Sequence, residues 1–156
     1  MTHQHRGGNV DQIVAPVKLT STVPTNTINK GDPCAIVSGF LVPAGAFTWD
    51  TDEATTQTGF AAAFAGFSDG RSIAGSTDPR VLELPINMGG NIEVDVASAT
   101  YEIGTFVACD SGSSLLKPGT LKATSTKAKA IGVIIRREGA ATTRALIRPI
   151  NTPVSR

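Results

Sequence analysis

Residues 91–96, Asn91-Ile92-Glu93-Val94-Asp95-Val96, form the most regular pattern in the sequence. Apolar side chains at 92, 94 and 96 alternate with carboxylates at 93 and 95, and a period of two residues places the two sets on opposite faces of a β-strand. One face of this strand should therefore pack on a core while the other faces water.

Short runs of strand-forming residues, separated by turn residues, extend this β pattern in both directions. The runs Val133-Ile134-Ile135 and Ala145-Leu146-Ile147 are continuously apolar and predict deeply buried strands. The break between them, residues 137–142, is short and contains glycine, so we expect an antiparallel hairpin. The predicted strands are 34–37, 64–67, 81–86, 92–96, 106–109, 130–136 and 143–150.

Residues 60–67 allow two interpretations. Their alanines favour a helix, but Gly59 and Gly66 bound the segment and leave it marginal in length for one. We predict a strand.

Composition agrees with a β-rich fold in a single domain. The 156 residues are enough to bury one hydrophobic core, and a second independent core is not expected. Charged residues make up 17% of the chain, below the usual level of about 25%, and glycine is abundant. The sequence therefore predicts an all-β protein, either a β-sandwich or a small β-barrel.

Charge and hydropathy exclude two classes of partner. The formal net charge is +1 with no long basic run, so no direct nucleic-acid partner is expected. The longest apolar stretch, residues 60–67, is far shorter than the roughly 20 residues of a membrane-spanning helix. Residues 1–6 are polar and lack the apolar part of a secretory signal. We expect a protein with no membrane partner, kept inside a cell or in an assembly built there.

Residues 1–27 carry few apolar positions and predict an extended N-terminal arm, followed by a single β domain over residues 28–156. Pro16 and Pro24 favour extended conformations in the residues that precede them. The segment is either a disordered terminus or an arm that becomes ordered on a neighbouring subunit. In the second case its candidate interface residues are Val10, Ile13, Val14 and Val17.

Two stretches of the β domain, residues 31–66 and 104–132, resemble each other. Each ends in a glycine within an apolar run, Gly66 or Gly132, where a bulge or a close backbone approach is possible. Two similar units facing each other would form a sandwich or barrel. Shared turn chemistry among common residues is the other explanation. The matched pairs are Gly31 with Gly104, Ala35 with Ala108, Ser38 with Ser111, and Gly39 with Gly112.

The first of these copies is longer than the second, and the extra residues fall within 47–58. This loop holds the only tryptophan, Trp49. Aromatic side chains are enriched in protein interfaces, which makes Trp49 a candidate interface residue. Alternatively, it covers one end of the core.

The β domain offers few groups for catalysis or metal binding. His3 and His5 are the only histidines, and both lie in the predicted arm. Asp50, Asp52 and Glu53 lack the glycine and distal glutamate of a calcium-binding loop, so a solvated turn is the better interpretation. We therefore expect no enzymatic activity, catalytic residue, metal or cofactor.

Cys34 and Cys109 are the only cysteines. They are too few for a disulfide scaffold and do not form a Cys-x-x-Cys pair. Since free cysteine behaves mainly as a small core residue, we predict two buried free thiols.

The strongest local charge feature is the pair Arg136 and Arg137, with Arg144 and Arg148 beyond the predicted hairpin turn. Charged side chains of this kind can protect strand edges from unwanted pairing. They can also contact an acidic partner surface. Arg136 and Arg137 are therefore candidate interface residues.

Four motifs follow one another along the chain: Gly-Asp-Pro at 31–33, Phe-Ala-Gly-Phe at 64–67, Gly-Thr-Phe-Val-Ala-Cys-Asp at 104–110, and Ala-Ile-Gly-Val-Ile-Ile at 130–135. A Leu-Ile-Arg-Pro ending follows. Together they resemble the small decoration, or cement, proteins that coat the capsids of tailed bacteriophages. The resemblance covers roughly residues 29–150.

This resemblance implies a β-rich structural virion protein, often trimeric, that binds the outside of the shell at junctions between capsomers. Its partner would be the major capsid protein lattice, and it would act as a homo-oligomer, with a trimer favoured. It would be made in the host cytoplasm and located on the capsid surface, with no cofactor. The alternative is a ligand-binding β-sandwich module, either carbohydrate-binding or part of a phage fibre.

Overall fold

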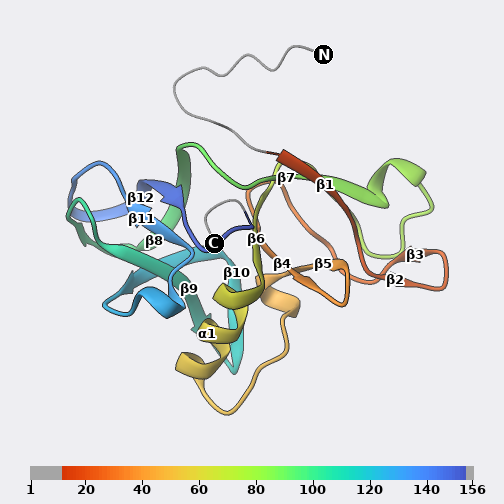
Figure 1. Cartoon of the computed structure of the whole chain (residues 1–156), viewed down its shortest axis with the longest axis horizontal. Helices are drawn as coiled ribbons and strands as arrows, with labels where there is room; N and C mark the ends of the chain where they lie inside the picture. The colour runs from red at the N-terminus through yellow and green to blue at the C-terminus, as the bar shows by residue number, and fades with distance from the viewer. Residues whose placement is uncertain (1–11, 154–156) are drawn as a thin grey trace.

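Two groups of five strands form the body of the protein and lie side by side (Figure 1). The structure is a computed structural model that describes residues 12–153. The first group has the order β1-β7-β6-β4-β5, and the second is a closed barrel of order β10-β8-β12-β11-β9. The first group consists of β1 (Gln12–Pro16), β4 (Pro33–Val37), β5 (Phe40–Pro43), β6 (Phe64–Ser68) and β7 (Glu83–Asn87). The second consists of β8 (Ile92–Tyr101), β9 (Phe106–Gly112), β10 (Leu115–Thr124), β11 (Gly132–Ile134) and β12 (Glu138–Pro149).

The remaining elements connect these strands. A two-stranded ribbon follows β1, and a helix, α1, joins β5 to β6 below the two groups in Figure 1. No helix within the described residues is long and apolar enough to span a membrane. These elements are β2 (Leu19–Thr20), β3 (Val23–Pro24), α1 (Glu53–Ala63), and three short 3-10 helices, Ala44–Ala46, Pro79–Val81 and Lys127–Lys129.

Both groups have the same connectivity. In chain order, the first strand pairs with the fifth, the fifth with the fourth, the fourth with the second, and the second with the third, always antiparallel. The third and first strands then meet in parallel, through Leu121 and Val96 in the second group. A single parallel bridge between Leu41 and Val17 does the same in the first. The all-β prediction is confirmed, and the two similar units also include β1 with β8 and β7 with β12.

The register of the two units agrees at the glycines. Gly66 lies opposite Cys34 on β4, and Gly132 lies opposite Val107 on β9. The hairpin turns do not follow the sequence match, because β9 has seven residues and β4 has five. The turn that corresponds to Ser38-Gly39 is Ser113-Ser114, two residues beyond the match made from sequence.

The buried side chains form two clusters within the one body, and not a single continuous core. Strands β4 and β6 stand between them. Cys34 and Ala65 belong to the cluster inside the first unit, whereas Ala35 and Phe64 belong to the larger cluster. All five residues of β6 are consequently buried. A strand enclosed on both faces cannot show alternating hydrophobicity.

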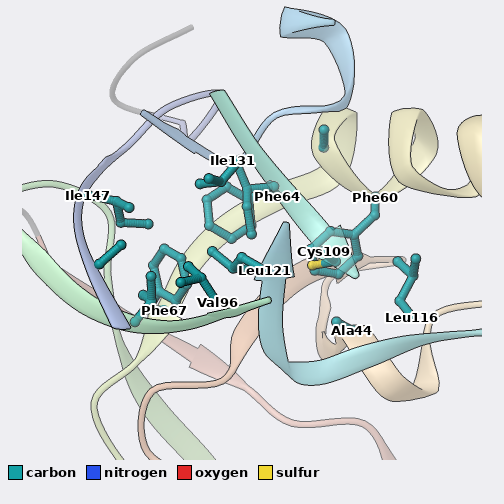
Figure 2. Close-up of a cluster of buried hydrophobic side chains, with 14 of the residues drawn as sticks. Ala44, Phe60, Phe64, Phe67, Val96, Cys109, Leu116, Leu121, Ile131 and Ile147 are labelled. Carbon is teal, nitrogen blue, oxygen red and sulfur yellow. The ribbon is translucent and has the colours of Figure 1, made fainter. Parts of the chain in front are cut away.

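The larger core draws side chains from both units (Figure 2). Phe60 on α1 and Phe64 and Phe67 on β6 pack with residues of the second barrel such as Leu121 and Ile147. The rings of Phe64 and Phe67 are 5.4 Å apart at 78°, an edge-to-face arrangement that aromatic pairs prefer. The first unit therefore completes the core of the second, and both belong to one folding body.

The prediction of a strand over residues 60–67 is wrong for its first half. Residues 60–63 are the last turn of α1, and the strand begins at Phe64. The helix starts earlier than its alanines indicate, because the Asp52 side chain accepts a hydrogen bond from the Thr55 amide at 2.7 Å and caps it. With eleven residues, α1 is no longer marginal in length, and Gly59 lies inside it.

The predicted arm is wrong from residue 12 onward, whereas residues 1–11, including Val10, lie outside the described residues. Strand β1 pairs with β7 of the same chain, with Ile13 opposite Ile86 and Ala15 opposite Leu84. Although Ala15 is the one fully buried side chain of β1, the strand is ordered because the backbone of β7 supplies its hydrogen bonds. Residues 12–17 are part of the first unit.

Candidate interaction surface

The described residues contain no group of three or more His, Cys, Asp or Glu side chains placed to hold a metal ion. Cys34 and Cys109 are free and buried, as predicted. Burial raises the pKa of both thiols far above the ordinary value, so both remain protonated at neutral pH. Neither is poised as a nucleophile.

The acids at 50–53 have structural partners. Asp50 accepts hydrogen bonds from the amide and hydroxyl of Thr51, and Glu53 forms an ion pair with Lys122 of β10. Hydrogen bonds from Thr55 lower the pKa of Asp52. Asp50 and Asp52 are exposed, as expected of a solvated turn, and the cluster in addition caps α1 and ties it to β10.

The interface residues predicted in the arm have different environments. Val17 is only 2% exposed and belongs to the core of the first unit, so the prediction that it lies in an interface is wrong. Its burial follows from the bridge to Leu41, which closes the sheet over it. Ile13 is half-buried and packs against the same core, whereas Val14 is 67% exposed on the outer face of β1.

Trp49 packs against the larger core and is partly buried. It lies in the segment between β5 and α1, close to where the helix begins. Of the two interpretations of this tryptophan, the one in which it covers an end of the core agrees with this position.

The four basic residues near the last hairpin are exposed, and Arg136, Arg137 and Arg144 are paired with carboxylates. Arg136 binds Glu138 at 2.8 Å, and Arg137 binds Glu102 at 3.0 Å. Arg144 lies 3.2 Å from Glu93 on the neighbouring strand. Since these carboxylates offset the positive charge, the cluster offers a weaker attraction to an acidic partner than its sequence implies.

Two of the exposed large apolar side chains lie at equivalent hairpin tips. Phe40, the first residue of β5, is 40% exposed, and Leu115, the first residue of β10, is 50% exposed. Each follows a turn whose two central residues have positive φ, as in type I′ hairpins. The two residues therefore occupy equivalent positions in the two units.

Sequence reasoning missed both tip residues. Each stands next to a leucine that is buried, Leu41 or Leu116, so the pairs Phe-Leu and Leu-Leu do not indicate which member faces out. The only available signal was the turn register, and the sequence match placed the second turn two residues too early.

A hollow of about 200 Å³ lies beside the first of these tips. Val37 is opposite Phe40 in the hairpin, and Val42 is two residues further along β5, so all three side chains share one face. Phe47, from the segment before α1, contributes another apolar wall. The rest of the hollow is lined by Lys18, Asn26, Ala46 and Thr48.

A second hollow, of about 190 Å³, is polar and lies where the two units meet. Its charged lining residues come from the β3–β4 loop and from β8 and β12. Asp32 is 7% exposed, accepts a hydrogen bond from the Asn29 amide at 2.8 Å, and has a pKa raised by burial. The charged residues that line it are Lys30, Asp32, Glu93, Asp95 and Arg144.

Comparison with protein-family models, curated proteins and solved structures finds no match to this chain. We therefore base the functional proposal on the residues described above.

Proposed function

We propose that this protein is a structural virion protein that binds the outer surface of an assembled phage capsid and stabilises the shell. The exposed apolar side chains at the two hairpin tips carry the proposal. Val37, Phe40 and Leu115 belong to neither buried core, so the fold does not account for them. Adjacent exposed apolar side chains, such as Val37 and Phe40, indicate an interaction site more strongly than a single one does.

The mechanism requires no chemical reaction. A protein that binds the assembled lattice, and not the free capsid subunits, lowers the free energy of the assembled state by mass action. The two units are well suited to this, because strands β4 and β6 contribute side chains to both cores and so join the units into one body. Burying a tip side chain on the partner gains about 25 cal/mol for each Å² of apolar surface removed from water.

The partner in this proposal is the lattice of the major capsid protein. We propose that the protein acts there as a homo-oligomer, with a trimer favoured, on the capsid surface after synthesis in the host cytoplasm. Several weak tip contacts in one oligomer would give a strong total attachment through effective concentration.

The test mixes purified protein with undecorated capsids of the phage that encodes it and images the particles. Wild-type protein should give regular density on the outer surface. The double variant F40S/L115S should bind at least about tenfold more weakly, because it loses both apolar tips. The matched control is I103S, which removes an exposed apolar side chain just before β9, at the end of that strand opposite the second tip, and should bind as wild type. Wild-type protein that stays in solution would refute the proposal.

The second candidate is a ligand-binding module, favoured by the polar hollow between the two units. Its carboxylates and guanidinium could accept and donate hydrogen bonds to a small polar ligand such as a sugar. A glycan array tests this directly. Binding by the wild type that disappears in E93Q/D95N would support this candidate, whereas an array without binding would exclude sugars as the ligand.

A further inference from the structure

The hollow beside Phe40 is built by the segment that lengthens the first unit. Phe47 and Thr48 come from residues between β5 and α1, the region in which the sequence match placed the extra residues. The equivalent place in the second unit is different in character. Val42, the third residue of β5, corresponds to Lys117, the third residue of β10, whose ammonium group forms an ion pair with Asp110.

The volume of the hollow selects the kind of occupant. At about 200 Å³ it is smaller than the roughly 300–1,000 Å³ of pockets that hold whole small molecules. It is nevertheless larger than a cavity of about 150 Å³, which is enough to bind benzene. A single aromatic or branched apolar side chain therefore fits.

The charge at its rim selects what should lie next to that side chain. Lys18 lines the hollow and is exposed, and it forms no ion pair with a carboxylate of residues 12–153. Among the described lining residues none is acidic, so the rim is positive. A carboxylate beside the inserted side chain would complement this charge.

We propose that this hollow binds a protein segment in which one aromatic or branched apolar side chain is followed by Asp or Glu. The apolar side chain enters between Val37, Val42 and Phe47, and the carboxylate pairs with Lys18. This inference rests on the proposed function, in which the segment belongs to the capsid protein, and it names the chemistry that the capsid surface must present.

Three blocked peptides test the pocket without any capsid. They share a Gly/Ser background and carry Phe-Asp, Phe-Lys or Ala-Asp at the centre, and binding is followed by NMR shifts of the Val37 and Val42 methyl groups. The Phe-Asp peptide should bind about tenfold more tightly than either of the others. In K18E the preference should reverse, with Phe-Lys bound more tightly than Phe-Asp.

A variant whose own side chain fills the hollow gives a second test of peptide binding. V37W places an indole in the hollow and should weaken Phe-Asp binding by about tenfold. I103W is the matched control, because it adds the same side chain at an exposed apolar position outside the hollow and both tips and should bind as wild type. Thermal unfolding of both variants establishes that they are folded.

Three results would overturn the inference. The first is equal binding of the three peptides, and the second is undiminished Phe-Asp binding by V37W. The third is a wild-type oligomer that V37W dissociates in sedimentation, since Phe40 of a second copy would then fill the hollow. The capsid assay keeps the two proposals apart. If V37W binds capsids as strongly as the wild type does, the inference about the hollow is wrong and the proposed function stands. If the wild type binds the Phe-Asp peptide but does not bind capsids, the proposed function is wrong and the inference about the hollow stands.

Discussion

Val14 and Val17 lie three residues apart near the N-terminal end of the first unit, and only Val17 is in a core. We expect V17A to lower the free energy of unfolding by about 2 kcal/mol, through lost burial and the cavity that remains. V14A should change it by less than about 0.5 kcal/mol, as is usual for exposed positions. Urea denaturation of the two variants measures both values. Equal effects would mean that β1 does not close the sheet over Val17.

The two thiols should be inert in the folded protein. Burial raises the pKa of Cys34 and of Cys109, so the reactive thiolate is absent not only at pH 7 but also at pH 9, where an exposed cysteine would be largely ionised. A disulfide reagent should modify neither residue in buffer and both in guanidinium. Rapid modification of one equivalent at pH 8 without denaturant would contradict this burial.

Some residue environments follow from composition and others do not. The burial of Cys34 and Cys109 could be predicted because free cysteine behaves as a small apolar residue nearly everywhere. The burial of Val17 could not, because its neighbours are Leu41 and the end of β7, which are distant in sequence. The exposure of Phe40 and Leu115 depends likewise on turn register, which decides the face of every residue in a hairpin.

Strands β6 and β11 contain equivalent glycines, Gly66 and Gly132, which should differ in how well they tolerate a larger side chain. A Cβ atom on Gly66 would lie 2.2 Å from the Asn87 carbonyl oxygen, and the φ of Gly66 is 150°. On Gly132 the nearest atom, at 2.6 Å, is the terminal methyl of Ile147, which can move. G66A should therefore cost more than about 3 kcal/mol, and G132A about 1–2 kcal/mol. Thermal unfolding compares them, and the reverse order would refute the register of β6.

Helix α1 shows how an element can be missed although its signals are present. Asp52, Glu53 and Thr55 form an N-cap and an acidic first turn, which are ordinary start signals. We weighed the acids only as a calcium-binding loop against a solvated turn, and so did not use them as a helix start. The helix passes directly into β6 at Phe64, without a connecting loop. No turn residue therefore marks where the helical side-chain period ends and the strand period begins.

At the scale of the whole molecule, strands β4 and β6 have one face in each core, so the two units should unfold together. Loss of either core exposes side chains of the same strands, so we expect one unfolding transition by calorimetry. V17A in the first core and L121A in the second should both lower the midpoint of that single transition. Two resolved transitions, each shifted by only one variant, would show that the units unfold separately.

The overall β character could be predicted, whereas the arrangement in two units could not. The alternation at 91–96 and the antiparallel pairing of β11 with β12 were predicted correctly from local patterns. The predicted turn at 137–142 was wrong, because residues 138–142 belong to β12 and lie along β8. The closing contacts Val17–Leu41 and Val96–Leu121 join segments that no local pattern connects. Chain length favoured one continuous core, because it does not reveal that a five-stranded sheet and a small barrel can pack together through β4 and β6.

The pairing of β1 with β7 also delays the completion of the first sheet while the chain is being synthesised. Gln12 and Asn87, which face each other across this pair, are separated by 75 positions. At about 5–20 residues per second on the ribosome, the first strand emerges roughly 4–15 s before its partner. During that interval its apolar side chains have no permanent neighbour, and the nascent chain is open to chaperones or to the wrong strand. Relocating β1 behind residue 87 by circular permutation would remove this wait.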